Sequence, residues 1–327
     1  MAHNLANVTG RTEMAYYGET PWHKLGTKVD QAMTAAEAIE ASGLNWTVEK
    51  RQAHFFDGGV SFPIPDKFAT VRTDANVALG VVGSRYHILQ NKESFSFFDA
   101  IVGEKLACYH TVGALGQGEK IWLLAKLPSE FWITADDKVE KYLLLTNSHD
   151  GSSAVQIMAT PIRVVCQNTL NMALAHGSER SRVRHTLSMG MGINAIRQQI
   201  GIADRHFQLF EEVGKHLASK QASSEIVDSL FKELGLTLEK AEDSTRTRNI
   251  RDEIERLYRY GKGNQLPGVK GTAWALLNGV VEYVDYTRTA KGKNTEASLQ
   301  SRANSLLFGS GADMKQQAMD TLLTLTK

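Results

Sequence analysis

The chain has 327 residues, of which 42% are hydrophobic and only 6 are proline, a composition that excludes disordered and fibrous proteins. Its 37 Lys and Arg side chains nearly balance 36 Asp and Glu side chains. The formal net charge of +1 excludes the globally basic profile of many nucleic-acid-binding proteins, but it allows a local basic surface. No stretch approaches the roughly 20 apolar residues of a membrane-spanning helix, so we expect a cytoplasmic protein without membrane contacts.

Charge and hydrophobic periodicity both change near residue 178. Residues 1–178 carry 15 basic and 18 acidic side chains, whereas residues 179–327 carry 22 basic and 18 acidic ones. Short β-type runs dominate the first part, and helical periodicity dominates the second. We therefore predict an α+β domain over 1–178 and a mainly helical, net basic region over 179–327.

The first part begins with a short helix and continues with strands. Thr34 is a suitable N-cap, and Gly43 a suitable stop, for a helix between them. Short groups of turn residues separate the following runs of strand character, which predicts antiparallel hairpins. The expected strands are 46–56, 68–73, 77–82, 142–147 and 154–158, and a further hairpin is expected to turn at 113–118.

Two more helices are expected in this part of the chain. Asn91 is expected to cap a helix that runs to about Val102. Pro161 suits the first turn of a helix, where its missing N–H is not needed, and that helix would run to about His176. The order of elements predicts an α+β fold, with an N-terminal antiparallel sheet packed with helices and a mainly α-helical C-terminal region.

The second part is expected to be helical. A seven-residue repeat over 193–217 is apolar at two positions in each repeat, apart from Gly214, and forms a seam that needs a partner helix. We therefore expect a homo-oligomer that is held together by this seam. Its contact residues would be Ile193, Ile196, Ile200, Phe207, Phe210 and Leu217. Further helices are expected at 224–234, 245–260, 272–286 and 313–325, and an exposed basic loop at 289–297.

Three arginines alternate along one short segment, at Arg180, Arg182 and Arg184. An extended backbone would place them on one face at intervals of about 6.6 to 6.8 Å. Because a guanidinium donates two hydrogen bonds to one phosphate, the row predicts contact with a nucleic-acid backbone. A solvated edge strand, whose charges discourage aggregation, explains the row equally well.

A second basic group is expected on the helix over 245–260 and in the loop after it. The spacing of Asp252 with Arg256, and of Glu255 with Arg259, predicts i,i+4 ion pairs. The remaining arginines of this helix, together with two loop lysines, are then free to contact an anion. These residues are Arg246, Arg248, Arg251, Lys291 and Lys293.

No catalytic residue, metal site or cofactor is predicted. The motifs GxxxxGK[ST], HExxH and GxSxG are absent from the sequence. The glycines of 113–118 lie between two strand-like runs, which favours a hairpin turn over a phosphate-binding loop. Asn278, Glu282 and Asp285 form one helical stripe with the oxygen ligands that a divalent cation takes, although such stripes more often face water or another helix.

Five segments along the chain have a specific sequence pattern. They are PWHKLGT (21–27), GALGQGEKIWLLAKLP (113–128), TPIRVVCQNTLNMAL (160–174), GTAWALLNGVVEYVDYTR (271–288) and SLLFGSGADMKQQAM (305–319). These segments resemble a family found in phages, prophages and plasmids, catalogued as domain-of-unknown-function family 932. Where this chain has Tyr286, the family is expected to carry His, which weakens any metal or acid–base hypothesis for that helix. The family implies no activity, but its setting favours DNA metabolism or host defence over intermediary metabolism.

Our leading hypothesis is a phage- or plasmid-encoded protein that binds and anneals single-stranded DNA as an oligomer, without catalysis. The order of hairpins and helices is similar to that of phage annealing proteins, an analogy of architecture without a shared motif. The alternative is an accessory or anti-defence protein of the mobile element that binds and occludes a host protein. A metal-dependent nuclease that uses Glu282 and Asp285 has the least support, because the acidic cluster is sparse.

Overall fold

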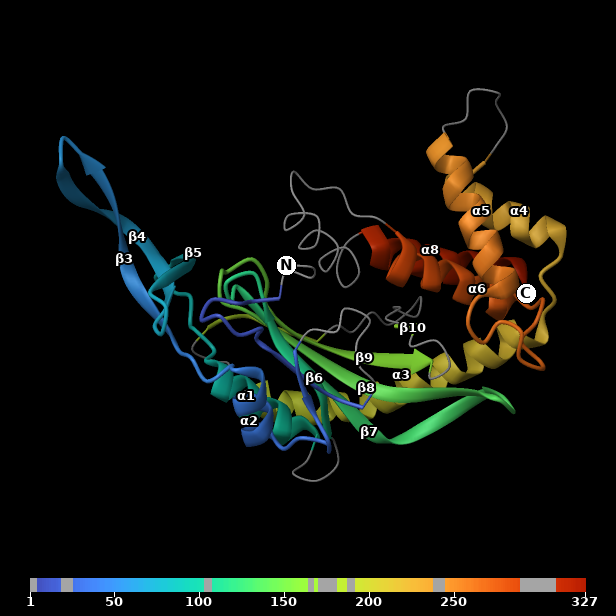
Figure 1. Cartoon of the computed structure of the whole chain (residues 1–327), viewed down its shortest axis with the longest axis horizontal. Coiled ribbons are helices and arrows are strands. Elements are labelled where there is room, and N and C mark those ends of the chain that lie inside the picture. Colours follow the sequence, from blue (N-terminus) through green and yellow to red (C-terminus); the bar gives the residue numbers. More distant parts are fainter. Residues whose placement is uncertain are drawn as a thin grey trace.

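The computed structural model describes residues 5–18, 26–102, 108–163, 168–169, 181–186, 192–237, 245–288 and 310–327. An eight-stranded sheet forms the body of the molecule, and a three-stranded sheet projects from one end of it (Figure 1). Helices dominate the C-terminal part, and α4 (Ser224–Glu233), α5 (Thr245–Tyr260) and α6 (Ala273–Glu282) lie toward the end opposite the projecting sheet. The predicted α+β fold is confirmed.

The main sheet has the strand order β10-β9-β8-β7-β6-β1-β2, and β11 also pairs with β9. Neighbouring strands are antiparallel, except that β1 and β2 are parallel. Leu123 lies opposite Leu145, which in turn lies opposite Ile157, so every second residue adds to one apolar face. The strands are β1 (Met14–Tyr17), β2 (Thr27–Val29), β6 (Cys108–Leu115), β7 (Lys120–Thr134), β8 (Asp137–Ser148), β9 (Val155–Arg163), β10 (Asn168–Thr169) and β11 (Ser181–Val183).

The helices begin and end close to where the sequence predicts them. The first shows why, because the Thr34 hydroxyl accepts from the Glu37 N–H and the Glu37 carboxylate accepts from the Thr34 N–H at 2.8 Å. Gly43 then ends the helix in the left-handed conformation with φ +73°. The helices are α1 (Ala35–Ser42), α2 (Asn91–Val102), α3 (Gly192–Ser219), α4 (Ser224–Glu233), α5 (Thr245–Tyr260), α6 (Ala273–Glu282), its π-helical continuation η2 (Tyr283–Thr287) and α8 (Ser310–Leu325).

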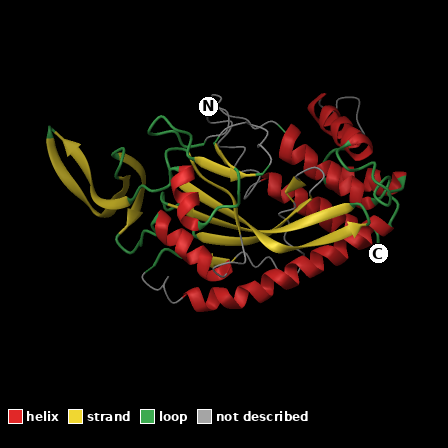
Figure 2. Cartoon of the chain, turned by 60° about the horizontal axis from the view of Figure 1, so that its bottom comes forward, coloured by secondary structure: helices red, strands yellow, loops and turns green. Residues whose placement is uncertain are grey.

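One face of the main sheet is covered by α1, α2 and α3, and α3 runs along the length of that face (Figure 2). The larger hydrophobic cluster contains buried side chains of both parts of the chain, and it joins Leu145 of the sheet to Phe210 and Trp274 of the helices. The indole N–H of Trp274 donates to the Asp137 carboxylate at 2.7 Å, which fixes α6 to the start of β8. None of the described helices is long and apolar enough to cross a membrane.

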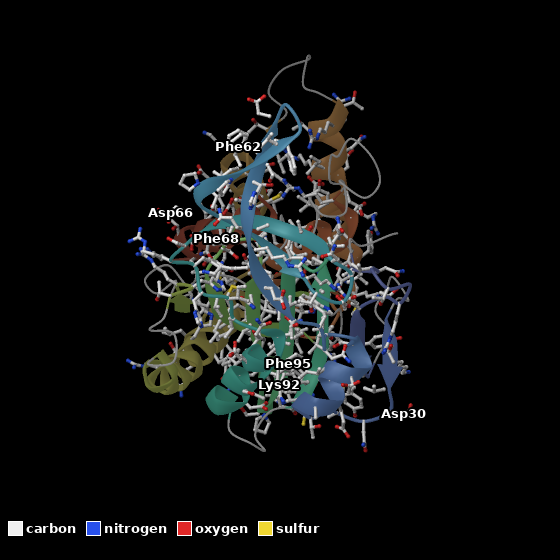
Figure 3. The ribbon with its side chains drawn as sticks, turned by 90° about the vertical axis from the view of Figure 1, so that its left-hand side faces the viewer. Asp30, Phe62, Asp66, Phe68, Lys92 and Phe95 are labelled. Carbon is white, nitrogen blue, oxygen red and sulfur yellow. The ribbon has the colours of Figure 1, made fainter. Side chains whose placement is uncertain are left out.

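The projecting sheet forms an arm of β3 (Val48–Asp57), β4 (Val60–Arg72) and β5 (Val77–Gly83) (Figures 1 and 3). Gly58 and Gly59 both have positive φ, as the tight two-residue turn between β3 and β4 requires. Because β5 pairs with β4 only from Lys67 to Arg72, residues 53–66 continue outward as a two-stranded ribbon. We call this ribbon the tip.

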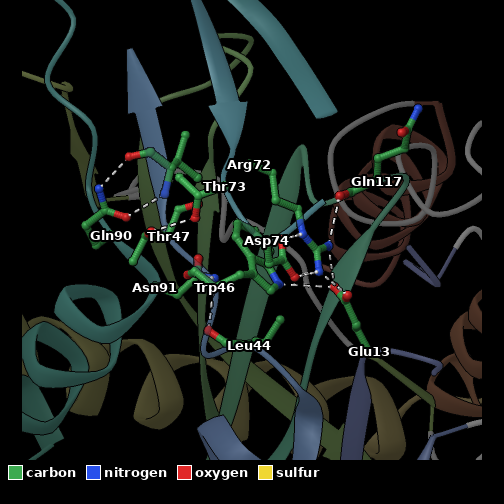
Figure 4. Close-up of polar contacts among 11 residues, drawn as sticks. Glu13, Leu44, Trp46, Thr47, Arg72, Thr73, Asp74, Gln90, Asn91 and Gln117 are labelled. Atoms are coloured by element: carbon green, nitrogen blue, oxygen red, sulfur yellow. Dashed lines mark hydrogen bonds and ion pairs between the residues drawn. The ribbon is translucent and has the colours of Figure 1, made fainter. Parts of the chain in front are cut away.

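A buried arginine joins the arm to the body (Figure 4). Arg72, at the end of β4, is 1% exposed and bonds both carboxylate oxygens of Glu13 at 2.5 and 2.9 Å. It also bonds Asp74 at 2.7 Å and the Gln117 carbonyl oxygen at 3.0 Å, and its guanidinium lies 4.4 Å from the ring of Trp46. Glu13 precedes β1, so this network links the base of the arm to the main sheet.

Two predictions about the start of a helix are wrong. Pro161 lies inside β9, opposite Lys141, and not in a helix that runs to His176. Two described strands pair with this side of β9: β11 pairs with residues 155–157 and β10 with residues 162–163. Pro161 lies between these two ranges, so neither strand needs the N–H that proline lacks. Asn91 begins α2, but its side chain donates to the carbonyl oxygens of Leu44 and Trp46 and does not cap the helix.

The helix expected over 193–217 is present as α3, but half of its predicted seam cannot hold two copies together. Phe207, Phe210 and Leu217 are fully buried within the chain's own core. Their partner surface is the sheet and α6, since Phe210 lies edge-on to both Phe131 and Trp274. The side chains of Ile193, Ile196 and Ile200 lie outside the described part of the structure. Self-association itself stays a prediction.

Candidate nucleic-acid interface

A cleft of about 580 Å³ opens between α4, α5 and the loop 261–271 that follows α5. Its lining includes both charged and aromatic side chains, among them Arg251, Arg259 and Lys270 together with Tyr258 and Tyr260. Arg251 is the predicted anion-binding residue that lies in this cleft. The cleft is therefore a concave surface in the net basic C-terminal part of the chain, and cationic side chains form part of its lining.

Local sequence explains the two walls of the cleft. The Ser223 hydroxyl caps α4 by accepting from the Ile226 N–H, and the apolar residues Ile254 and Leu257 fasten α5 to the core. The buried amide of Asn264 holds the loop in place, because it donates to the carbonyl oxygens of Leu257 and Ala275, each at 3.0 Å. The cleft is thus built on secondary structure and buried hydrogen bonds.

Arg251 has a structural role at the floor of the cleft. Its guanidinium bonds Asp228 of α4 at 2.6 Å and Glu255 of α5 at 3.2 Å, and it lies 4.6 Å from the ring of Phe231. Burial lowers the pKa of Arg251, but the two carboxylates outweigh burial and raise it above its usual value. Since Arg251 joins α4 to α5 and its charge is neutralised, the expectation that it is free for a ligand is wrong.

The pairing of the other charges on α5 also differs from the prediction. Arg256 bonds Glu253 at 2.7 Å instead of Asp252, and Glu255 bonds Arg251 instead of Arg259. Arg259 is therefore left exposed on the wall of the cleft, and Lys270 is exposed on the loop opposite. Within the described residues, neither side chain has an ion pair. Tyr260, next to Arg259, has 71% of its surface exposed.

The remaining predicted cations are not brought to one surface. Arg248 is exposed one turn before Arg251 on the same face of α5, but it does not line the cleft. Arg246 is exposed on another face of α5. Burial raises the pKa of Tyr283, and the charges of Arg288 and Arg246 offset part of that rise. Arg184 is exposed beyond β11 on the main sheet.

Several predicted site residues fall outside what the structure describes. Arg180, Lys291 and Lys293 are not among the described residues, and Arg182 is described only as backbone of β11. The position of Arg182 opposite Gln156 confirms an extended segment there. Whether the arginine row contacts phosphate stays a prediction, as does a role for the two lysines.

The polar stripe on α6 does not converge on a metal ion. Asn278 is buried, and its amide donates to the Trp274 carbonyl oxygen at 2.9 Å. Glu282 accepts from the N–H of Lys262, while the buried Asp285 bonds the buried ammonium of Lys315 at 2.9 Å. Across the described residues, no three His, Cys, Asp or Glu side chains are grouped closely enough to hold a metal ion.

Sequence reasoning missed three residues of the cleft, namely Arg259, Tyr260 and Lys270. The signal that identifies them is the segment YRYGKGNQLPGVK, where an exposed tyrosine precedes a loop rich in Gly and Lys. Spacing alone assigned Arg259 to Glu255. Spacing could not show that Arg251 also pairs with Asp228, which lies 23 residues before it, or that Glu255 pairs with Arg251 in place of Arg259.

Comparison with known proteins places the chain in a family without giving it an activity. No curated protein and no solved structure matches it. One family model matches residues 78–307, which is more than half of the chain and includes the whole cleft, but it begins after β3 and β4 of the arm. By this match, and in agreement with the resemblance of its sequence motifs, the chain belongs to the family described as a domain of unknown function (DUF932).

Proposed function

We propose that this protein binds single-stranded DNA in the cytoplasm without catalysis, and that the α4–α5 cleft holds the strand. The observation that supports this most is the grouping of Arg259 and Lys270, without ion pairs in the described part of the chain, beside the exposed ring of Tyr260. Cations along a groove hold phosphates, and an exposed aromatic ring stacks on a base of any sequence.

The strand would follow the face of α5 that carries Arg248 and Arg259 and then cross to Lys270 on the loop. Phosphate contacts carry no sequence information, and stacking tolerates every base. Binding of this kind leaves the choice of partner strand to base pairing, which is what strand annealing requires. The ion pairs of Arg251 with Asp228 and Glu255 join the two walls without adding free charge.

Fluorescence anisotropy of a labelled oligothymidine, titrated at several salt concentrations, tests the proposal. The Arg259→Gln, Lys270→Gln double variant should bind more weakly, and its slope of log affinity against log salt should be flatter by about 1.4, since each single-strand phosphate contact contributes about 0.7. Arg256→Gln is the control for the Arg259 change, because it removes one positive charge from the same helix at a side chain that is paired with Glu253 and 56% exposed. An equal loss in this control contradicts the site.

Tyr260 tests the stacking part of the proposal separately. Tyr260→Ala should weaken binding by roughly 5- to 150-fold, which corresponds to about 1 to 3 kcal/mol per stacked base, while Tyr260→Phe should keep most of the affinity. If the parent protein shows no salt-sensitive binding even at low ionic strength, single-stranded DNA is not its ligand. The alternative, occlusion of a host protein, then becomes the better hypothesis.

A further inference from the structure

The tip of the arm exposes apolar side chains that nothing in the described structure covers. Phe55, Phe56, Val60 and Phe62 are 51%, 74%, 55% and 42% exposed. Phe55 and Phe62 lie opposite each other across the ribbon and stack with their ring centroids 5.3 Å apart. Phe56 follows Phe55 along β3 and extends from the other face, so aromatic rings are exposed on both faces of the ribbon. Scattered exposed apolar residues are ordinary, but several aromatic rings grouped at the end of a projection mark an interaction surface.

The arm presents this group in a fixed position. The Gln52 amide spans the irregular pairing where the tip begins, donating to the carbonyl oxygens of Ile64 at 2.7 Å and Lys67 at 3.0 Å. At the other end, Arg72 ties β4 to Glu13 of the body with both partners almost completely buried. Ten residues of β3 give the arm a reach of about 33 Å.

The charge of the tip selects its partner. Between Gln52 and Lys67 the chain has no Lys or Arg, but it has Asp57 and Asp66. Such a tip repels nucleic acid and anionic membranes, and it attracts a basic surface. Pro63 and Pro65 remove N–H groups from β4, so the tip is poorly suited to adding another strand and must dock through its side chains.

A surface that complements the tip lies on this same chain, at the opposite end of its long axis (Figure 1). The α4–α5 cleft offers Arg259 and Lys270, which have no ion pair among the described residues, together with tyrosine rings. We infer that the tip of one chain docks into the α4–α5 cleft of a second copy, with its phenylalanines against the tyrosines and its carboxylates against the cations. A contact between two tips is disfavoured, because it would bring like charges together.

The docking is head to tail, because the tip and the cleft are different surfaces at opposite ends of the molecule. Each chain then keeps one free tip or one free cleft, and association continues until a ring closes or a filament grows. This assembly does not use the seam on α3. The assembly can also be tested without DNA, because light scattering measures the mass of the protein alone.

Two complementary variants test the inference by light scattering over a range of concentrations. The tip variant combines Phe55→Ser, Phe56→Ser and Phe62→Ser, all at exposed positions, and the cleft variant combines Arg259→Glu with Lys270→Glu. We expect the mass of the parent to rise with concentration and each variant alone to be monomeric. A 1:1 mixture retains one working tip and one working cleft, so it should form a heterodimer and grow no further.

Several outcomes overturn the inference. The inference is wrong if the parent stays monomeric at every concentration, or if the tip variant assembles to the same mass as the parent. A cleft variant that assembles on its own also overturns it, because its tip then binds a surface other than the cleft, such as a second tip. Val81→Ser is the matched control, because Val81 is 62% exposed on β5 at the base of the arm and should leave assembly unchanged.

A charge exchange covers the case in which loss of the phenylalanines disturbs the ribbon itself. Asp57→Lys reverses a charge beside the tight turn and leaves every ring in place. This change alone should weaken assembly, and Lys270→Glu in the same chain should restore it at least in part. If the double variant assembles no better than either single variant, the tip and the cleft do not meet.

Discussion

At the scale of single residues, His149 shows what burial does to a titratable group. It is fully buried, and its Nε2 lies 2.8 Å from the Asn91 amide oxygen. Because the Asn91 amide nitrogen donates to two carbonyl oxygens, its oxygen must accept, which places the proton of His149 on Nε2. Burial, and then the neighbouring charge of His185, lower the pKa of His149 to about 3.

This shift makes stability depend on pH with a definite sign. An unfolded His binds a proton below about pH 6.5, whereas folded His149 does not until about pH 3, so acid favours the unfolded state across this window. Between pH 7.5 and 5 we expect His149 to contribute a loss of about 2 kcal/mol in the free energy of unfolding. Urea unfolding of parent and His149→Gln should show a shallower pH dependence in the variant. Parallel pH profiles would contradict the assignment.

At the scale of elements, Gly214 explains how closely α3 packs on the sheet. A Cβ at this position would overlap the Cδ1 atom of Ile133 on β7. In the sequence, Gly214 interrupts the apolar seam over 193–217 that predicts contact between two copies of the chain. The structure shows instead that it is the point where the helix needs no side chain, because the sheet of the same chain lies against it.

A double-mutant cycle measures this packing. Gly214→Ala should destabilise the protein by roughly 1 kcal/mol, because overpacking costs about 1 to 3 kcal/mol and the gain in helix propensity returns about 1. In an Ile133→Val background, which lacks the overlapping atom, the same change should be neutral or stabilising. Chemical unfolding of the four proteins gives the coupling energy. Additive effects would show that Ile133 moves aside without cost.

The elements that could be predicted from the sequence are those whose ends are set locally. Thr34 with Glu37 and Gly43 defines α1, and Thr272 caps α6, because each cap needs only neighbours in the chain. Pro161 was misassigned because a proline suits both the first turn of a helix and an edge position of a strand, and only the pairing of β9 decides between them.

The cleft is less predictable than the fold for a related reason. The presence of a basic helix was correctly predicted, but which of its arginines are free depends on Asp228 of α4. Lys270 reaches the cleft because Asn264 and the bridge between Gln221 and Thr272 place the loop there. These are contacts between elements, and periodicity or i,i+4 spacing contains no information about them.

At the scale of the whole molecule, one cleft serves both proposals. Arg259 and Lys270 would bind phosphates of DNA or the carboxylates of another chain's tip, and Tyr260 would meet a base or a phenylalanine ring. Two ligands that share a site must weaken each other by the same factor. Under both proposals the tip would imitate a short anionic, aromatic strand, and the proposed DNA site of a chain whose cleft holds a tip would be occupied.

This competition predicts that oligothymidine dissociates the assembly. At a protein concentration where the parent is assembled, adding saturating oligonucleotide should lower the mass measured by light scattering to that of a protein–DNA complex with one chain. The tip variant with three Phe→Ser changes, whose own cleft is intact, should bind the oligonucleotide more tightly than the parent at that concentration. In dilute solution, where the parent is monomeric, the two affinities should agree.

A parent that keeps its assembled mass while saturated with oligonucleotide would place DNA and the tip on separate surfaces. The cleft variant, measured in both assays, would then show which of the two ligands Arg259 and Lys270 bind.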